Sequence, residues 1–247
     1  MSDAYIIISL AILSGAFIQG CLGFGFGMIS VPPLLMYLSL DEVIPMQIPL
    51  SMILTIPLGW QVRHHFQYKL VIPLLLGALI GLPIGIWVLN HFSGSVLRLA
   101  VGGVLVGLPT LMLMGWSRPL PNRLYTLIPI GMMSGVLQGS VSISAPPIIL
   151  FLTNQGMHKD QFRANVLLFF TGLGFIALTG ITLNGMYTPT VMSMIAKLLI
   201  IVPIGGYAGA KLATKIPQKL FRTLTLLVSA FMGGALLLRS AIVLLGQ

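Results

Sequence analysis

The chain has 247 residues, of which 57% are hydrophobic and only 7% are charged, and its mean hydropathy is +1.03. That composition excludes a soluble globular protein, because too few polar side chains exist to cover its surface, and it predicts an integral membrane protein in the lipid bilayer. The formal net charge of +9 does not indicate a nucleic-acid partner, because the Lys and Arg residues form short clusters between apolar runs, as orientation signals do.

The first apolar segment covers residues 4–40 and contains no charged side chain. As one helix it would be about 55 Å long, whereas the hydrocarbon core of a bilayer is about 30 Å thick. The run Gln19-Gly20-Cys21-Leu22-Gly23-Phe24-Gly25-Phe26-Gly27 interrupts it, and Pro32-Pro33 follow. We therefore expect a broken segment that stays in the fold, since it lacks the basic leader of a signal peptide. The single cysteine, Cys21, cannot form an internal disulfide.

Six further apolar segments are long enough for single spans, at residues 43–60, 70–89, 99–116, 164–183, 191–210 and 220–245. Three basic clusters separate the spans: Arg63, His64, His65 and Lys69; Arg118 and Arg123; and Lys211, Lys215, Lys219 and Arg222. The positive-inside rule places all three clusters in the cytoplasm. The second long segment, residues 124–157, must then enter and leave the membrane on one side. The same U shape in residues 4–40 predicts that both termini lie outside.

The two halves, residues 1–123 and 124–247, are predicted to be repeats within a single membrane domain. Positions recur 124 residues apart: Gly81, Gly85 and Arg98 correspond to Gly205, Gly209 and Arg222. Each half contains an odd number of elements, so the halves have opposite orientations. The predicted fold is an all-α polytopic membrane protein with two inverted-topology repeats, each containing an interrupted or hairpin first segment and three transmembrane helices. Such repeats build transporters with a site near the midplane.

The two interruptions are the predicted substrate site, because irregular backbone within a membrane must be covered by protein or line a polar cavity. Gly23, Gly25 and Gly27 would let a ligand approach main-chain N–H groups. A half-helix that begins near residues 30–33 would add unsatisfied donors and a partial positive charge, which suits an anion. Close helix packing is the alternative use of each glycine.

The second interruption reads Gln138-Gly139-Ser140-Val141-Ser142-Ile143-Ser144 and leads to Pro146-Pro147. Its serines place hydroxyl donors at the break, and the two prolines fit the first turn of a following helix. Gln19-Gly20 and Gln138-Gly139 resemble each other, and both glutamines are counted among the predicted substrate contacts.

Polar residues early in two spans, Gln47 and Asn165, could hydrogen-bond a ligand or join helices, and both interpretations stay open. Lys197 lies about seven residues into an apolar span, where it either snorkels or contacts an anion. Arg163 is expected to be a cytoplasmic orientation charge rather than a group that attracts the substrate to the inner mouth.

The four acidic residues, Asp3, Asp41, Glu42 and Asp160, all fall in predicted loops or at the terminus. Without an intramembrane carboxylate, a proton relay and cation transport are disfavoured. We predict no metal and no cofactor. The histidines lie in or next to loops, which leaves the serines without a general base, so we do not predict an enzyme. An inside-negative potential favours anion exit by about 2.3 kcal/mol per charge per 100 mV, which makes export the downhill direction.

These features resemble the sulfite exporter TauE/SafE family of bacterial and archaeal membrane transporters. The resemblance covers nearly the whole chain and is carried by the pairs Ser14-Gly15 and Gln19-Gly20, the run from Gly23 to Gly27, both Pro-Pro pairs, Gly135 and Gly139, and the glycine-rich spans ending near Arg98 and Arg222. It implies an inner-membrane transporter of small sulfur-containing anions, such as sulfite or organosulfonates like sulfoacetate. The second break carries serines where many members have more glycine, so the substrate's identity is not transferred.

We therefore predict an exporter of a small sulfur-containing anion. Its predicted substrate-binding residues are Gln19, Gly23, Phe24, Gly25, Gly27, Gln47, Gln138, Ser140, Ser142, Ser144, Asn165 and Lys197. An ion-coupled uptake permease of the same fold and a non-transporting membrane subunit are the alternatives. The oligomeric state is left open and includes a homo-oligomer.

Overall fold

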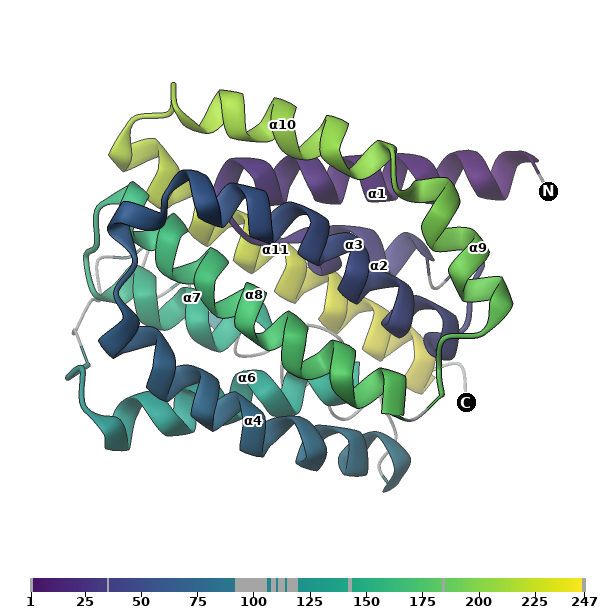
Figure 1. The fold of residues 1–247 in the computed structure, drawn as a ribbon, viewed down its shortest axis with the longest axis horizontal. Helices are drawn as coiled ribbons and strands as arrows, with labels where there is room; N and C mark the ends of the chain where they lie inside the picture. Colours follow the sequence, from purple (N-terminus) through teal and green to yellow (C-terminus); the bar gives the residue numbers. More distant parts are fainter. Residues whose placement is uncertain are drawn as a thin grey trace. The chain divides into compact units, whose positions relative to one another are not determined.

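The computed structural model describes residues 2–34, 36–91, 106–107, 110, 114, 120–141, 144–183 and 185–245, and their regular structure is helical (Figure 1). The predicted all-α fold is confirmed. Most of the predicted span at residues 99–116, together with Arg98 and Arg118, lies outside the described residues. The elements are α1 (Ser2–Leu22), α2 (Phe26–Leu34), α3 (Leu40–Gln61), η1 (Arg63–His65), α4 (Tyr68–His91), α6 (Leu124–Val141), α7 (Ala145–Asn154), α8 (Lys159–Leu183), α9 (Pro189–Leu198), α10 (Ile201–Ala213) and α11 (Gln218–Leu245).

The helices group into two compact units, which we describe separately. Unit 1 comprises Met1–Val71 and Arg163–Ile216, and unit 2 comprises Ile72–Phe162 and Pro217–Gln247. Unit 1 thus holds α1, α2, α3, α9, α10 and most of α8, whereas unit 2 holds α6, α7, α11 and most of α4. Each unit draws helices from both sequence halves, and the assignment of residues 1–123 and 124–247 as the two repeats stays a prediction.

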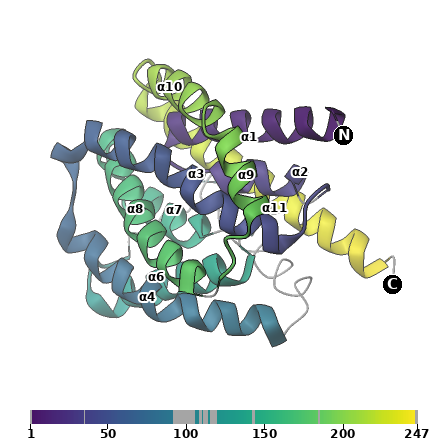
Figure 2. The same ribbon diagram turned by 45° about the vertical axis from the view of Figure 1, so that its right-hand side comes forward.

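Unit 1 has a continuous apolar core, in which α1 packs along α10 and both contact α3 (Figure 2). Ile12 of α1, Leu34 of α2, Leu50 of α3 and Leu167 of α8 are fully buried there. Burying such side chains provides the main driving force for packing between these helices and fixes the first interruption against α3 and α8.

Glycines let helices touch backbone to backbone in both units. In unit 1, a Cβ on Gly209 of α10 would overlap the Phe17 carbonyl oxygen, and one on Gly205 would lie 2.7 Å from the Leu13 oxygen. In unit 2, a Cβ on Gly85 of α4 would overlap the Val136 oxygen of α6. Only glycine permits these approaches, so the small residues serve packing here, as the alternative interpretation held.

The Gly209–Phe17 contact of unit 1 and the Gly85–Val136 contact of unit 2 occupy corresponding positions in the two halves of the sequence. Gly209 follows Gly85 by 124 residues, and their partners Phe17 and Val136 are 119 residues apart. In unit 1 the first helix of the first half packs on α10 of the second half, and in unit 2 the first helix of the second half packs on α4 of the first half. This exchange supports a duplication, while the inverted orientation of the halves stays a prediction.

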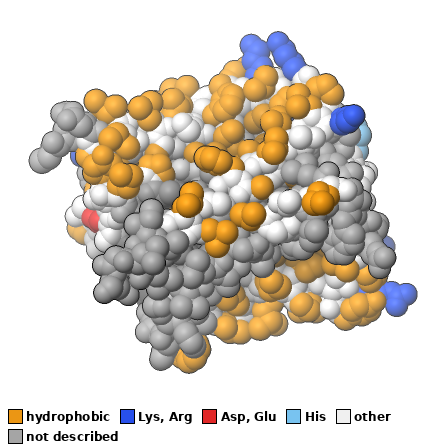
Figure 3. Space-filling model, turned by 180° about the vertical axis from the view of Figure 1, so that it is seen from behind, with side chains coloured by type: hydrophobic (Ala, Val, Ile, Leu, Met, Phe, Trp, Pro, Cys, Tyr) orange, Lys and Arg blue, Asp and Glu red, His pale blue; other side chains and the backbone are white. Residues whose placement is uncertain are grey.

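Among the described residues, four helices are long and apolar enough to cross a membrane, judged by length and composition: α1, α3, α4 and α8. The pair α9 and α10 adds a fifth span if it crosses as one bent element. Figure 3 shows hydrophobic side chains over much of one face, with the Lys and Arg side chains at its margins. Large apolar side chains such as Tyr207 of α10 and Phe231 of α11 are exposed, which fits contact with lipid.

The predicted span over residues 191–210 is not one straight helix. α9 ends at Leu198 and α10 begins at Ile201, and the two are bent by 43°. Pro203 explains the bend, because it has no N–H for the Leu199 carbonyl and its ring would collide with that carbonyl in a straight helix.

Candidate functional site

The first interruption is a three-residue break between α1 and α2. Gly23 and Gly25 adopt φ angles of 89° and 103°, a region that side-chain-bearing residues rarely occupy. The Gly23 amide still donates to the Gln19 carbonyl at 2.7 Å, and helical bonding resumes where the Ile29 amide donates to Gly25 at 3.0 Å. The glycines therefore turn the chain, as the sequence predicts, and Phe24 between them is fully buried.

After this break, α2 folds back along α1. A Cβ on Gly25 would lie 3.0 Å from Ile18, and one on Gly15 would lie 2.8 Å from the Phe26 carbonyl oxygen and 3.4 Å from the Ser30 Cβ. Residues 15 and 26 could not meet in a straight helix, in which about 16 Å would separate them. The segment is a helical hairpin, visible as α2 beside α1 in Figures 1 and 2.

The predicted half-helix start near residues 30–33 is wrong, because α2 begins at Phe26. Its first backbone N–H groups, including that of Gly27, therefore lie directly after the glycine turn and lack carbonyl partners within the helix. Pro32-Pro33 fall in the last turn, where their missing N–H groups bring the helix to its end at Leu34. The donors thus lie closer to Gly23 and Gly25 than the sequence suggested.

Three buried polar side chains line the junction of α1, α2 and α3. Gln19 is 2% exposed, Ser30 is fully buried and Gln47 is 5% exposed. The Ser30 hydroxyl donates to the Phe26 carbonyl at 2.6 Å, and Nε2 of Gln47 donates to the Ser30 Oγ at 2.7 Å. The Oε1 atoms of Gln19 and Gln47 are buried without a hydrogen-bond partner among the described residues. The structure thus brings Gln47 to the first break.

Arg163 is buried in α8 and reaches the end of α1. Its guanidinium Nη2 donates to the Gly20 carbonyl at 2.9 Å, and a Cβ added to Gly23 would lie 3.5 Å from the Arg163 Cα. A cation is favourable at a helix C-terminus, where the last carbonyls carry partial negative charge. The sequence assigned Arg163 to membrane orientation and did not include it in the site. A charge five residues into a long apolar helix was the available signal.

Asn165 joins two helices. Its Oδ1 accepts from the Gln67 amide at 2.9 Å, and its Nδ2 donates to the Gln67 Oε1 at 3.3 Å. Gln67 directly precedes α4, so this pair ties the start of α8 to the start of α4. The structure supports the helix-joining interpretation of Asn165, and a role in substrate binding stays a prediction.

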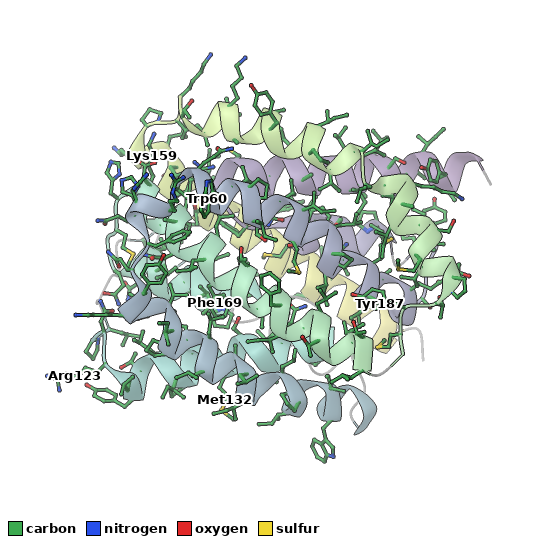
Figure 4. The ribbon with its side chains drawn as sticks, in the orientation of Figure 1. Trp60, Arg123, Met132, Lys159, Phe169 and Tyr187 are labelled. Atoms are coloured by element: carbon green, nitrogen blue, oxygen red, sulfur yellow. The ribbon has the colours of Figure 1, made fainter. Side chains whose placement is uncertain are left out.

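Lys197 is exposed in the last turn of α9, apart from the buried polar residues described above. Trp60 and Tyr187 mark opposite ends of unit 1 (Figure 4). Tyr187 precedes α9, and burial raises its pKa to about 12, so its hydroxyl is neutral under ordinary conditions. A contact between Lys197 and the substrate stays a prediction.

The second interruption belongs to unit 2. Ser144 precedes α7, and prolines occupy the first turn of that helix, which confirms the predicted place of Pro146-Pro147. The Ser134 hydroxyl donates to the Ser144 carbonyl at 2.5 Å, so α7 also folds back along α6. The Ser140 hydroxyl donates to the Val136 carbonyl at 2.7 Å and must rotate before it can donate to a ligand.

Gln138 is half-buried, and Ser142 lies outside the described residues. The two breaks are in different units, so a single cradle built from both stays a prediction.

The described acidic side chains lie at helix starts. Glu42 accepts from the Ser39 amide at 2.9 Å, and Asp160 lies 3.5 Å from the His158 Nδ1 at the surface. None of the described acidic side chains is buried, whereas Arg163 is. The described residues also contain no group of three or more His, Cys, Asp or Glu side chains suited to a metal ion. The junction in unit 1 therefore favours an anion over a cation.

The model of the family described as "Sulfite exporter TauE/SafE" matches residues 7–236. No curated protein and no solved structure matches the chain.

Proposed function

We propose a function from one premise, which is that the chain belongs to the sulfite exporter TauE/SafE family. Members of this family are transporters, and the activity that follows is membrane transport of a sulfur-containing anion. We further propose sulfite, or an organosulfonate such as sulfoacetate, as the substrate and export as the direction. The lipid bilayer concerned is the cytoplasmic (inner) membrane of a bacterium or archaeon.

One observation carries the proposal beyond family membership. The α1–α2 hairpin gathers the backbone N–H groups at the start of α2, the neutral amides of Gln19 and Gln47, and the Arg163 guanidinium in unit 1. The guanidinium is positively charged, the start of α2 is partially positive, and no acidic side chain of unit 1 is buried among the described residues. A buried positive environment stabilises an oxyanion and repels a metal cation.

The charges of unit 1 support an orientation. Basic side chains gather where α3 and α10 end and α4 begins: Arg63, His64, His65, Lys69, Lys211 and Lys215. Glu42 lies at the opposite end of α3 (Figure 1). By the positive-inside rule the basic end faces the cytoplasm, which puts the start of α1 outside. Arg163, at the end of α1, would then lie at the cytoplasmic side of the break.

Flux measurements with the full chain reconstituted in lipid vesicles test the proposal. We expect an imposed potential, negative inside the compartment that holds the anion, to drive sulfite or sulfoacetate out faster than from protein-free vesicles. Inward flux that requires a sodium or proton gradient would instead support the uptake permease. If no gradient moves either anion through folded protein, the proposed substrate class is wrong.

The triple variant Ser140→Ala, Ser142→Ala and Ser144→Ala tests the second break in the same assay. Loss of flux in folded protein would support an anion contact there. Native-like flux would keep the transporter and remove these serines from the site.

A further inference from the structure

The hydrogen bonds around Ser30 fix the orientation of the Gln47 amide. The Phe26 carbonyl can only accept a hydrogen bond, so the Ser30 hydroxyl donates its single proton to that oxygen at 2.6 Å. The Ser30 oxygen can then only accept from Gln47, which must present Nε2 at 2.7 Å. An amide orientation is often ambiguous, but this chain of donors leaves one solution. The atom that Gln47 has left over is therefore the acceptor Oε1.

The Gln47 Oε1 is buried, and its chemistry determines which ligand groups can bind to it. Gln47 is 5% exposed, and its Oε1 has no partner among the described residues. A second amide oxygen, the Oε1 of Gln19, is buried in the same way. Gln19 lies one helical turn after Gly15, which faces Ser30, so both amides border the α1–α2 hairpin. A buried amide oxygen is satisfied by a hydrogen-bond donor or a cation, and a fully ionised oxyanion supplies neither.

A cation is the poorer occupant of this junction. Arg163 lies at the adjoining end of α1, and the N-terminus of α2 adds partial positive charge. Sodium and calcium sites are built from several oxygens, commonly with carboxylates, and no buried acid exists among the described side chains. An anion that keeps one O–H group satisfies both features, because its charge suits Arg163 and its proton suits the amide oxygen.

We propose that Oε1 of Gln47 accepts a hydrogen bond from the bound substrate, so that the protein recognises a protonated monoanion such as hydrogen sulfite and disfavours the fully ionised dianion. This inference rests on the proposed function and adds the protonation state that the site recognises. Of the substrates proposed above it selects sulfite, as the protonated monoanion, over an organosulfonate such as sulfoacetate, which is fully ionised near neutral pH and has no O–H group. Ser30 acts as a positioning residue, because it sets which end of the Gln47 amide faces the ligand.

Few titratable groups around Gln47 could imitate this selectivity. On the helices that pack against α3, the described titratable side chains are Tyr5 and Cys21 of α1, Lys159, Asp160 and Arg163 of α8, Lys197 of α9, and Tyr207 and Lys211 of α10. α2 has none, and α3 itself contributes Glu42. The imidazoles of His64 and His65 are exposed in η1, directly after α3.

The test compares sulfite with methanesulfonate, a permanently ionised monoanion that has three similar oxygens and no O–H. Potential-driven flux through the full chain in vesicles is measured from neutral to alkaline pH, with the protein-free leak subtracted. We expect sulfite flux to fall about tenfold per pH unit once the dianion dominates, in step with hydrogen sulfite, and methanesulfonate flux to stay low and level. Sulfite flux that is constant or rises with pH overturns the inference.

The variant Ser30→Ala sharpens the test. Without the hydroxyl the Gln47 amide can rotate and present Nε2, so we expect the methanesulfonate-to-sulfite flux ratio to rise about tenfold and the pH dependence to flatten. Ser30→Thr keeps the hydroxyl and should keep the native ratio, and a His64→Gln, His65→Gln double variant should keep the native pH profile. An active Ser30→Ala protein with the native ratio overturns the inference.

Two further arms separate the outcomes. Replacing sodium with a large organic cation should leave the flux unchanged, and a sodium requirement would assign Gln47 to a cation and overturn the inference. If the native protein moves both anions with the same pH dependence, this inference fails and the proposed function stands. If it moves neither, the proposed function fails and this inference fails with it. The native pH profile decides the matter even if Ser30→Ala does not fold.

Discussion

The two hairpins begin their second helices at equivalent residues but offer a ligand different groups. When Gly20 is aligned with Gly139, Phe26 corresponds to Ala145, and these residues begin α2 and α7. Gly27 then corresponds to Pro146. The first turn of α2 therefore has N–H donors without a carbonyl partner in the helix, whereas two of the first three residues of α7 are prolines and have no N–H group. The two hairpins therefore share their helix starts and glycine contacts but differ in the hydrogen-bond donors that they can offer to a ligand.

This difference points to the first hairpin as the main source of anion-binding groups. Its surroundings add the Arg163 guanidinium and the amides of Gln19 and Gln47. At the second break, the described serine hydroxyl of Ser140 is engaged within α6. We expect substitutions at the first hairpin to alter transport more than substitutions of similar size at the second.

The largest expected effect is the loss of Arg163. In Arg163→Gln the Gly20 carbonyl and the substrate both lose a cationic partner, and a hydrogen bond to a charged group contributes about 1.5–3 kcal/mol. We expect anion flux to fall by up to about a hundredfold. Lys211→Gln removes an exposed charge from the same unit and is the matched control. Native flux in Arg163→Gln would remove the guanidinium from the transport site.

A second prediction tests whether the repeated glycine contacts are equivalent. Gly209→Ala in unit 1 and Gly85→Ala in unit 2 each force a Cβ against a carbonyl oxygen of the neighbouring helix. We expect each to lower the free energy of unfolding by about 1–3 kcal/mol, by similar amounts, in thermal or denaturant unfolding in detergent. Gly234→Ala has open space and should be neutral. Very different losses at residues 85 and 209 would show that the two contacts are not equivalent.

The sequence predicted the elements that depend on local chemistry. The glycine run predicted the first break, and Pro146-Pro147 predicted the first turn of α7, because proline tolerates that position. Both features follow from backbone rules that act within a few residues. For Gln47 the sequence left ligand binding and helix joining open; the structure places its amide on Ser30 of α2, and a substrate contact stays a prediction.

The missed features depend on contacts between distant residues or on a choice among similar ones. Arg163 meets Gly20 across 143 residues of sequence, so its position within α8 was a signal for burial but nothing local identified its partner. Several glycines precede α2, and the sequence alone does not say that Gly23 and Gly25 are the two with positive φ. The bend before α10 did have a signal in Pro203, whose effect on the Leu199 carbonyl was not counted.

A third prediction concerns the turn itself. Gly25→Ala would place a side chain at φ 103° and 3.0 Å from Ile18. We expect a loss of about 1–2 kcal/mol in stability, within the range known for strained backbone positions, and a parallel loss of flux as the start of α2 moves. Unfolding and flux should be measured on the same preparation. An unchanged protein would mean that the turn has another accessible conformation.

The smallest expected effect is at Lys197, the predicted charge contact that the structure leaves exposed. A lysine that snorkels to the interface is screened by water and counterions, and such an exposed charge typically contributes less than about 1 kcal/mol to an interaction. Lys197→Gln should therefore change sulfite flux by less than about twofold, whereas Arg163→Gln changes it greatly. Measuring both variants at low and high ionic strength isolates a steering role, since a contribution from Lys197 would fade as salt rises. A large, salt-independent loss in Lys197→Gln would instead show that the side chain contacts the anion directly and that the first hairpin does not act alone.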